Sequence, residues 1–554
     1  MLSEIPSCLQ SLPLSSPNMN GISSIALPLE ETGLFSSIFI DFIEQRQWLD
    51  HFQLPKPDLQ GLLQVAQDAE WEKFDRKLLL NTLTAQYREL EESGTVISEA
   101  VKDNLEALSS PDSRTITTGQ QLHPATGPLY VVFKILSTLN LCKQLNAVQQ
   151  QHRFIPVFWL ASEDHDLQEV RELQVAGKTY TWLTEQSGPT GRISCKGLPE
   201  MLEQLKTDLG ARPGIDKLLA DVFNAYKSEY TLSLATRKLI HEWFGKAGLL
   251  MIDPDAAALK RSFIPVMQRD ITRQEAPQAA KRLEEELSTH GSLPLSIRSV
   301  NLFYLGEQFR LRIDTIPGGF RTPDERFNWT PEQLSAEIEA FPQRFSPNVV
   351  LRPLYQQSIL PNVAYIGGPA EVVYWLQLRG VFQLHDIPFP VLLPRAHAVL
   401  VDNNLYEKFR RMGFAGKDWL EKPDELIARW MNARGITTEV FDQARKQTTL
   451  EMDALTGFME ATDKTLGDAG RAEKVRMLQA IDKLEEKWKK SQKRSEDQSV
   501  QVIRKVRDRI FPNGTLQERH DNILGFIGSG DLQHPMDLLE HMDPLKKSLN
   551  LICY

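Results

Sequence analysis

The sequence predicts an α/β protein with a parallel sheet at its core and a long antiparallel α-helical coiled coil toward its C-terminus. Strand-like and helix-like segments alternate between residues 114 and 393, which favours parallel strands joined by right-handed crossovers. Two strand-to-helix junctions, at 117–130 and 364–371, carry a glycine just before a proline that opens a helix. From about 425 to 511 the chain is highly charged and glycine-poor, with apolar residues spaced by threes and fours.

Size and composition are those of an ordinary soluble protein with more than one domain. The chain has 554 residues, of which 41% are hydrophobic and 25% are charged. The formal net charge of −10 argues against a general nucleic-acid-binding protein. No apolar run approaches the roughly 18 residues that a membrane span needs. We therefore expect neither a nucleic-acid partner nor a membrane partner.

The N-terminal region and the cysteines bear on where the protein works. Residues 1–24 are expected to form a disordered extension. The first eighteen of them lack the positive n-region and apolar core of a secretory signal, so they are either a disordered tail or an upstream extension ahead of a true start at Met19. The cysteines are scattered without metal-type pairing, so we expect reduced thiols. They are Cys8, Cys142, Cys195 and Cys553. These features predict a cytoplasmic protein.

The catalytic core is expected to span residues 25–424. Its predicted elements are helices within 34–107, strand 114–118, helix 128–149, strand 154–161, helix 233–247, strand 248–252, strand 363–366, helix 369–378 and strand 389–393. The stretches 170–230 and 255–350 are too long for simple loops, which rarely exceed ~15 residues. We expect both to be insertions that cap the ligand-binding edge of the sheet.

The predicted coiled coil spans residues 425–511. A helix over 440–458 is expected to pair with the seam that follows, with the chain reversing near 467–470, and residues 512–554 are expected to pack back on the core. Two apolar seams are predicted: Val475, Leu478, Ile481, Leu484 and Trp488, and Val500, Ile503, Val506 and Ile510.

Ligand-type side chains follow several of the predicted strands. Ligands of open parallel sheets bind at the carboxyl ends of the strands, so these side chains should meet in one cleft. The helices that begin at 128 and 369 should offer free amides and a positive dipole end to phosphate or carboxylate. The substrate-binding candidates are Gln120, Gln121, Gly127, Tyr130, Trp159, Arg352, Tyr365, Gly367, Gly368, Glu371 and Arg395.

Several candidates have a second interpretation. The adjacent glutamines fit sugar hydroxyls or adenine, but their amides could equally satisfy backbone groups of a buried turn. Glu371 could bind substrate or simply complement the dipole of its own helix. Arg352, which leaves an apolar strand, and Arg395 are candidate anion clamps. Tyr374 and Trp375 are interpreted as core residues.

The cluster Glu163, Asp164, His165 and Asp166 supplies the catalytic candidates. Histidine and carboxylates suit Zn²⁺ or Mn²⁺, but four consecutive residues cannot all face one ion. A structural interpretation is that an aspartate caps the next helix. We favour a third, in which the carboxylates bind an ammonium or hydroxyls and His165 shuttles a proton. No protein-bound metal centre is expected.

Other chemistries are disfavoured by the motifs that the sequence lacks. It has no Walker A sequence, no G-x-S-x-G elbow and no paired Cys-x-x-Cys, which argues against P-loop ATP hydrolysis, serine hydrolysis and structural zinc. The basic residues between 487 and 507 are interpreted as the solvated surface of the coiled coil.

A set of motifs, in order along the chain, resembles the cysteine-adding enzymes of bacillithiol biosynthesis. The resemblance runs from about Ile25 to the C-terminus. The motifs are Thr118-Gly119-Gln120-Gln121, Gly127-Pro128-Leu129-Tyr130, Pro156 through Asp166, Ser346-Pro347-Asn348 through Arg352-Pro353, Leu360-Pro361, Tyr365 through Glu371, Phe511-Pro512-Asn513-Gly514 and Gln517-Glu518-Arg519.

The resemblance implies a Rossmann-like core related to class I nucleotidylyl transferases, with two connecting insertions and a coiled coil used to form a homodimer. It also implies the last step of bacillithiol synthesis, in which the cysteine carboxyl joins the amino group of glucosaminyl-malate. Because that carboxyl needs activation, ATP is the expected co-substrate, with Mg²⁺ as its candidate companion. Two departures, His397 and His123-Pro124, argue against a mobile nucleotide-binding turn at 394–397.

Two other functions stay open at this point. The chain could be a class I-like nucleotidylyl transferase that activates a different amino acid or acid. It could also be a coiled-coil scaffold with a non-catalytic core. Release of phosphate or pyrophosphate only in the presence of cysteine would separate the first alternative from the ligase, and failure to bind any nucleotide, amino acid or amino sugar would favour the second.

Overall fold

The computed structural model describes residues 22–68, 74–212, 214–434, 438–495 and 497–554. These residues form two compact units. The core contains the described residues up to Leu400 together with Thr515–Tyr554, and the helical unit is Val401–Gly514. Within the described ranges, every helix is too short or too polar to span a lipid bilayer.

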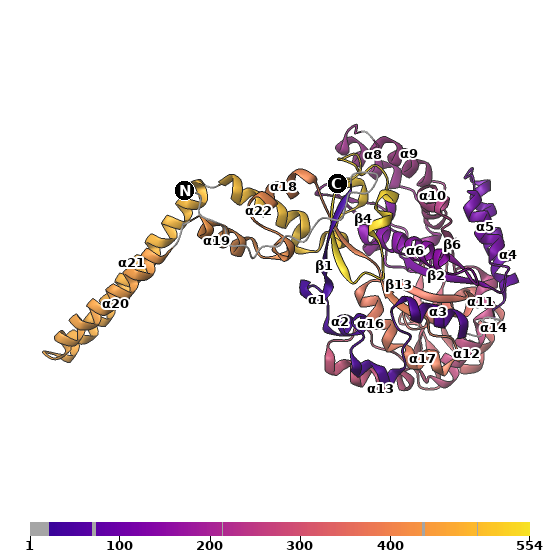
Figure 1. The fold of residues 1–554 in the computed structure, drawn as a ribbon. Helices are drawn as coiled ribbons and strands as arrows, with labels where there is room; N and C mark the ends of the chain where they lie inside the picture. The colour runs from indigo at the N-terminus through magenta and orange to yellow at the C-terminus, as the bar shows by residue number, and fades with distance from the viewer. Residues whose placement is uncertain (1–21, 69–73, 213, 435–437, 496) are drawn as a thin grey trace. The chain divides into compact units, whose positions relative to one another are not determined.

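The core is built on a sheet of five parallel strands in the order β14-β13-β2-β3-β6. Strands β2, β6 and β13 of this sheet are labelled in Figure 1. Their bounds are Ser113–Gln120 (β2), Arg153–Leu160 (β3), Leu250–Ile252 (β6), Asn362–Gly367 (β13) and Val391–Pro394 (β14). The chain moves outward from β2 through β3 and β6, then crosses to the other side of β2 for β13 and β14. The strand order therefore reverses between β2 and β13, the position at which open α/β sheets bind ligands. The predicted Rossmann-like sheet is confirmed.

Apolar burial holds this sheet to its helices. Helix α6 (Leu129–Val148) follows β2 and packs on β2, β3 and β13. Leu141 and Leu145 of α6 join Ile116 of β2 and Leu62 of α3 in one fully buried cluster. All residues of β3 after its first are buried, as its apolar run predicts for a strand covered on both faces.

Six further core helices agree with predicted helical ranges: α2 (Ser37–Ile43), α3 (Leu59–Asp68), α4 (Arg76–Glu92), α5 (Glu99–Ala107), α10 (Leu232–Phe244) and α16 (Pro369–Gln377). Three others were not predicted: α1 (Leu29–Thr32), α15 (Leu351–Ile359) and α17 (Arg379–Leu384). One prediction is wrong, because Arg352 lies in the first turn of α15 and does not leave a strand. Asn348 Oδ1 accepts the Val350 N–H at 2.8 Å, and this local bond favours a helix start over an extended chain.

Both insertions carry structure of their own. The first contains α7 (Leu167–Val170), β4 (Glu172–Val175), β5 (Lys178–Thr181), α8 (Leu198–Leu209) and α9 (Ile215–Ala225). The second contains α11 (Ala257–Ser262), α12 (Ile264–Arg273), α13 (Ala276–His290), β7 (Leu302–Leu305), β8 (Arg310–Arg312), β9 (Asp314–Ile316), β10 (Gly319–Arg321), β11 (Asn328–Trp329), α14 (Pro331–Ala340) and β12 (Phe345–Pro347). Strands β12, β7 and β8 form a small antiparallel sheet.

The two ends of the described chain meet in a second sheet of the core. Strand β1 (Ser23–Pro28) pairs antiparallel with β16 (Ser548–Cys553), which also neighbours β15 (His397–Val401). The predicted extension is therefore too long by at least two residues, and residues 1–21 lie outside the described ranges. Cys8 lies there too, whereas Cys142 and Cys195 are buried free thiols, and burial raises the pKa of Cys195 to about 12.

The helical unit contains a long antiparallel hairpin of α20 (Glu439–Glu460) and α21 (Lys464–Ser495). The two helices lie side by side in Figure 1. This confirms the predicted coiled coil. The unit also contains α18 (Asn403–Arg411), α19 (Pro423–Ala433) and α22 (Asp497–Ile510), so it begins well before residue 425. The second predicted seam lies on α22, where Val500 and Ile503 are buried and α22 packs against α18 and α19, outside the hairpin.

The hairpin reverses at 461–463, earlier than predicted. Gly467 and Gly470 lie inside α21 and do not form the turn. A Cβ on Gly470 would lie 2.6 Å from Thr456 Oγ1, so this glycine lets α20 and α21 approach closely. The first predicted seam is only partly covered, since Val475 is 53% exposed and Leu484 is 59% exposed.

Candidate functional site

Two adjoining cavities lie where β2, β3 and β13 end. Cavity 1 has a volume of about 450 Å³ and cavity 2 a volume of about 810 Å³. Residues from the ends of both β2 and β13 line cavity 1, which places it where the strand order reverses. The second insertion lines much of cavity 2. The wall common to both cavities contains Trp159, Ala161, Val349, Arg352 and Tyr374.

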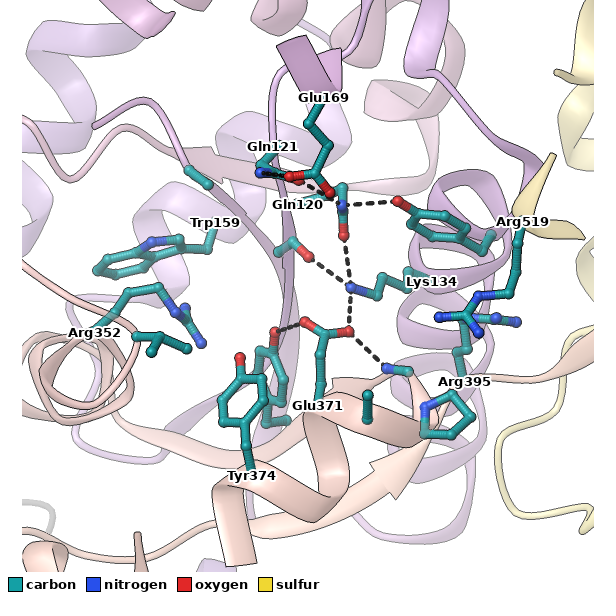
Figure 2. A pocket seen from close by; sticks show the side chains of 18 residues that line it. Gln120, Gln121, Lys134, Trp159, Glu169, Arg352, Glu371, Tyr374, Arg395 and Arg519 are labelled. Atoms are coloured by element: carbon teal, nitrogen blue, oxygen red, sulfur yellow. Dashed lines mark hydrogen bonds and ion pairs between the residues drawn. The ribbon is translucent and has the colours of Figure 1, made fainter. Parts of the chain in front are cut away.

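Lys134 of α6 holds the centre of cavity 1 together (Figure 2). Its side chain is 2% exposed, and its Nζ donates to Gly119 O at 3.0 Å and to Gln120 Oε1 at 2.8 Å. The same nitrogen lies 2.5 Å from Glu371 Oε2. A buried ammonium is tolerated only when it is paired and hydrogen-bonded. Lys134 therefore ties the end of β2 to the start of α16.

Glu371 closes the start of α16 with its own carboxylate. Its Oε2 also accepts the Gly368 N–H at 2.7 Å, and its Oε1 accepts the Tyr365 hydroxyl at 2.9 Å. Burial works to raise the pKa of Glu371, but the Lys134 ammonium and these donors bring that pKa below its ordinary value. Glu371 is thus a fixed anion at the helix end, which supports the helix-capping interpretation of this residue.

The two glutamines bind side chains, not the backbone of their turn. Gln120 Nε2 donates to the Tyr130 hydroxyl at 3.0 Å. Gln121 Nε2 donates to Asp164 Oδ2 at 2.9 Å and to Glu169 Oε2 at 2.7 Å. Burial raises the pKa of Tyr130 to about 12, so its phenol is neutral at pH 7. Gln120 faces cavity 1, and Gln121 links that cavity to the acidic cluster.

Two guanidinium groups of cavity 1 have no carboxylate within 4 Å among the described residues. They belong to Arg352 in α15 and Arg519 in the C-terminal segment, and Figure 2 shows them on opposite sides of the pocket. Arg352 Nη1 donates to Gln356 Oε1 at 3.2 Å, and its Cζ lies 5.5 Å from the centre of the Tyr365 ring. Cations left uncompensated beside a cavity favour an anionic ligand.

Arg395, by contrast, is already neutralised. Its Nη1 and Nη2 each donate to Glu518 at 2.7 Å, and His397 Nδ1 lies 2.9 Å from the same carboxylate. All three side chains are at least 97% buried. Arg395 lines cavity 1, but its charge is committed to Glu518, and the segment 394–397 is fixed by this cluster.

Glu163, which lines cavity 2, belongs to a buried ion pair. Glu163 Oε1 lies 2.5 Å from Lys260 Nζ, and Lys260 also lies 3.0 Å from Asp255 Oδ1. Burial raises the pKa of Glu163 above its ordinary value, although Lys260 opposes that change. Because its partner is as buried as it is, Glu163 holds the strand end in place and is poorly placed to exchange protons with a ligand.

Asp164 and His165 face cavity 2 next to an arginine. His165 Nδ1 lies 3.3 Å from Arg310 Nη1 and 3.6 Å from Asp164 Oδ1. The Arg310 guanidinium stacks over Phe303, with 3.8 Å between Cζ and the ring centre. Burial works to raise the pKa of Asp164, but bonds from His165 and the charge of Arg310 bring it well below its ordinary range. Asp164 is therefore an anion at neutral pH.

Three predicted site residues lie away from both cavities. Gly127 has a φ of 67°, and a Cβ there would lie 2.5 Å from His123 Cβ, so its role is to form the turn. Gly367 passes beneath Arg395 and accepts the Arg395 N–H at 2.8 Å. Asp166 caps α7, which confirms the capping interpretation for this one member of the acidic cluster.

Two further expectations are corrected. The start of α6 does not offer a free anion site, because the Leu129 N–H donates to Asp521 O at 2.8 Å. Tyr374 is not a core residue but part of the wall shared by the cavities, whereas Trp375 is buried and stacks on Tyr365 with 4.3 Å between ring centres. Among the described residues, none from 170–230 lines either cavity, so of the two insertions only the second contributes to their walls. The first still contacts this edge of the sheet, because the Gly191 N–H donates to Ser162 O at 2.8 Å.

Four charged residues of the site escaped the sequence reasoning: Lys134, Lys260, Arg310 and Arg519. Lys134 did carry a usable signal, since a lysine on the otherwise apolar stripe of a buried helix needs a partner. Lys260 and Arg310 lie outside every motif singled out in the sequence, and Arg519 ends the Gln517-Glu518-Arg519 motif, which follows none of the predicted strands. Together with Arg352, they give a cationic cavity 1 and a cavity 2 of mixed charge, suited to a substrate with carboxylate or phosphate at one end and an amine at the other.

Two family models cover the described chain almost completely. The model described as "Bacillithiol biosynthesis BshC, N-terminal Rossmann-like domain" matches residues 22–396, and that of the BshC C-terminal coiled-coil domain matches residues 398–553. A Cytophaga hutchinsonii protein described as "Putative cysteine ligase BshC" is 34% identical over 538 residues, covering 97% of this chain and 100% of the relative. A Flavobacterium johnsoniae protein with the same description is 32% identical over 526 residues, covering 94% and 98%. The chain therefore belongs to the BshC family of bacillithiol biosynthesis.

Proposed function

We propose that this protein is a carbon–nitrogen ligase that joins the carboxyl of cysteine to the amino group of glucosaminyl-malate, using ATP. The observation that supports this most directly is the pair of adjoining cavities at the point where the strand order reverses. One has uncompensated guanidinium groups, the other an aspartate and a histidine, and Arg352 lies in the wall between them. Amide formation needs these two environments side by side.

Cavity 1 is the proposed place for anionic groups. Arg352 would bind malate carboxylates or nucleotide phosphates through charge-assisted hydrogen bonds, while Gln120 and Tyr130 offer an amide and a hydroxyl to neutral polar groups. Mg²⁺ would accompany ATP and reduce its negative charge. The Lys134–Glu371 pair helps to keep Gln120 in position, because it ties the end of β2 to the start of α16.

Cavity 2 is the proposed place for the amine. The neutral amine nitrogen attacks the activated acyl carbon of cysteine, the new C–N bond forms, and AMP or phosphate leaves with the electron pair of the broken C–O bond. His165 would accept the proton that the nitrogen loses, and Asp164, ionised and 3.6 Å from its ring, would stabilise the imidazolium. Asp166 has no part in this step, because it caps α7.

The hairpin of α20 and α21 is the proposed dimer interface. Val440, Leu455 and Phe458 on α20 are 72%, 49% and 76% exposed. At 100° per residue they fall within about 60° of one another around the helix axis. An apolar stripe of this kind on a charged helix is typical of a surface that a second helix covers.

The buried thiols and the absence of paired cysteine motifs support a location in the reducing cytoplasm.

The test is an assay of the purified protein with cysteine, ATP and glucosaminyl-malate, followed by mass spectrometry. We expect the thiol product with one equivalent of either AMP or ADP. When serine replaces cysteine, we expect neither an amide product nor release of AMP or ADP. His165→Ala should lower the rate about 100-fold or more, as expected for loss of a general base, while His51→Ala, which alters an exposed histidine, should not. Adenylation of some other acid without cysteine would point to a different nucleotidylyl transferase.

A further inference from the structure

The segment that follows the helical unit is bound tightly to the core on both sides of one arginine. Gln517 Oε1 accepts the Leu400 N–H at 2.7 Å, and its Nε2 donates to Leu400 O at 3.0 Å. Glu518 is bound by Arg395 and His397, and its Oε2 also accepts the Ala398 N–H at 3.3 Å. Both side chains are almost completely buried, so residues 517 and 518 cannot shift without breaking this network.

The residues after the arginine are fixed in the same way. Asp521 O accepts the Leu129 N–H, and Asn522 Nδ2 donates to Ala125 O at 2.8 Å and to Gly127 O. The segment is therefore joined to the loop between β2 and α6 on one side and to β15 on the other.

Arg519 is the exception in this segment. Its side chain is exposed and lines cavity 1, and among the described residues no carboxylate lies within 4 Å of it. Its neighbours Glu518 and Asp521 take part in ion pairs with Arg395 and His520. An anchored backbone that carries one uncompensated guanidinium into a cavity is preorganised to bind an anion, because little motion remains to be lost on binding.

We propose that Arg519 is a substrate-binding residue that contacts an anionic group in cavity 1, and that Gln517 and Glu518 are its positioning residues. On this proposal the reaction site is incomplete without the segment that contains residues 517–522, which follows the helical unit in the sequence. The anionic group is a carboxylate or a phosphate, since a guanidinium forms the same paired hydrogen bonds with either. This inference rests on the proposed function only for the identity of the substrates.

Binding measurements on the full-length protein show whether Arg519 contacts a carboxylate of glucosaminyl-malate or a phosphate of ATP. Isothermal titration with glucosaminyl-malate and, separately, with ATP would compare wild type, Arg519→Ala, Arg519→Lys and the control Arg282→Ala, which removes an exposed arginine of α13. We expect Arg519→Ala to weaken binding of one of these ligands by about 10- to 100-fold. Arg519→Lys should recover part of the loss, and Arg282→Ala should change nothing. Unchanged binding of both ligands to Arg519→Ala overturns the proposal.

The proposal is also testable if the proposed reaction fails. Phenylglyoxal modifies accessible arginines, and mass spectrometry of peptides gives the extent at each one. Arg519 should react readily and the buried Arg395 slowly, and either L-malate or inorganic pyrophosphate should protect Arg519 while leaving Arg282 reactive. Absence of protection by both anions overturns the proposal whatever the ligation assay shows. The Glu518→Gln variant, if folded, should weaken binding of the same ligand as Arg519→Ala, but by a smaller factor. Labelling of Arg282 should be unchanged in this variant.

Discussion

Gly119 lets two strands approach each other at the edge of cavity 1. A Cβ at this position would lie 2.9 Å from Trp159 O and 3.1 Å from Trp159 Cβ, so β2 and β3 would have to separate. We expect Gly119→Ala to destabilise the protein by about 1–3 kcal/mol and to reduce ligand binding, because Gln120 moves with the strand.

The matched control for this substitution is Gly457→Ala, at an exposed helical glycine with open space around its Cβ. It should leave stability unchanged or raise it by about 1 kcal/mol. Urea unfolding of both variants is the measurement. Equal stability of the two would show that the contact between β2 and β3 at this point is not tight.

His123 makes the stability of the core depend on pH. The residue is 5% exposed, neither ring nitrogen has a hydrogen-bond partner among the described residues, and burial lowers its pKa to about 4. The unfolded chain takes up a proton near pH 6.5, well before the folded one, so stability falls as the pH drops from about 6.5 to about 4. The loss between pH 7.5 and 4.5 is about 2.5 kcal/mol.

Replacing His123 with leucine should remove that part of the pH dependence. Urea unfolding at pH 7.5 and 4.5 would show a smaller loss for His123→Leu than for wild type. If both proteins lose the same stability between these two pH values, the imidazole does not titrate as its burial implies.

At the residue scale, sequence reasoning located the polar side chains that directly follow strands, such as Gln120 and Glu371. The rule that ligands bind at the carboxyl ends of parallel strands requires only the positions of the strands. It missed Lys134 and Arg310, because their position depends on how a helix and an inserted sheet pack. It also could not distinguish Arg352, whose charge is uncompensated, from Arg395, because the partner of Arg395 is 123 positions away in the sequence.

The ion pair between α6 and α16 should behave as a unit. Lys134→Met leaves the Glu371 carboxylate, whose side chain is 25% exposed, without its counter-charge, so we expect a loss below the about 3–5 kcal/mol that breaking a fully buried pair costs. The double variant Lys134→Met/Glu371→Gln should recover part of this stability, because it removes both charges. Thermal or urea unfolding of the single and double variants tests this coupling. Strictly additive losses would mean that the pair is not coupled.

At the element scale, helices and strands were predictable where apolar periodicity was strong, and a local hydrogen bond and a close contact between helices explain two failures. The Asn348 side chain starts α15 where an apolar run suggested a strand. Gly467 and Gly470 suggested a turn, but they lie within α21 and allow close contact with α20. A glycine that permits close packing and a glycine that forms a turn look alike in a single sequence.

The exposed apolar stripe of α20 gives a prediction for the whole molecule. If two copies associate through the hairpin, Phe458→Glu combined with Leu455→Glu should convert a dimer into a monomer with unchanged thermal stability of the core. Size-exclusion chromatography with light scattering measures this directly. The control is Val96→Glu, which changes an apolar residue on the surface of the other unit, where it is 89% exposed. This variant should leave the dimer intact. If the protein with both substitutions remains a dimer, the dimer interface lies elsewhere.

The whole molecule brings together segments that lie far apart in the sequence. Cavity 1 takes residues from β2, α6, α15, α16 and the C-terminal segment. The alternating pattern predicted the sheet and therefore the meeting of β2 with β13. It did not predict the return of residues 515–554 to this cavity, because that depends on buried contacts such as those of Glu518 and not on any local pattern.

A crystal structure with glucosaminyl-malate bound is the most direct test of where this protein binds its substrate. The account predicts ligand density in cavity 1 with a carboxylate beside Arg352 or Arg519, and with the amine directed across the shared wall toward His165 in cavity 2. Density for the ligand on another surface of the core, with both cavities filled only by water, would contradict it.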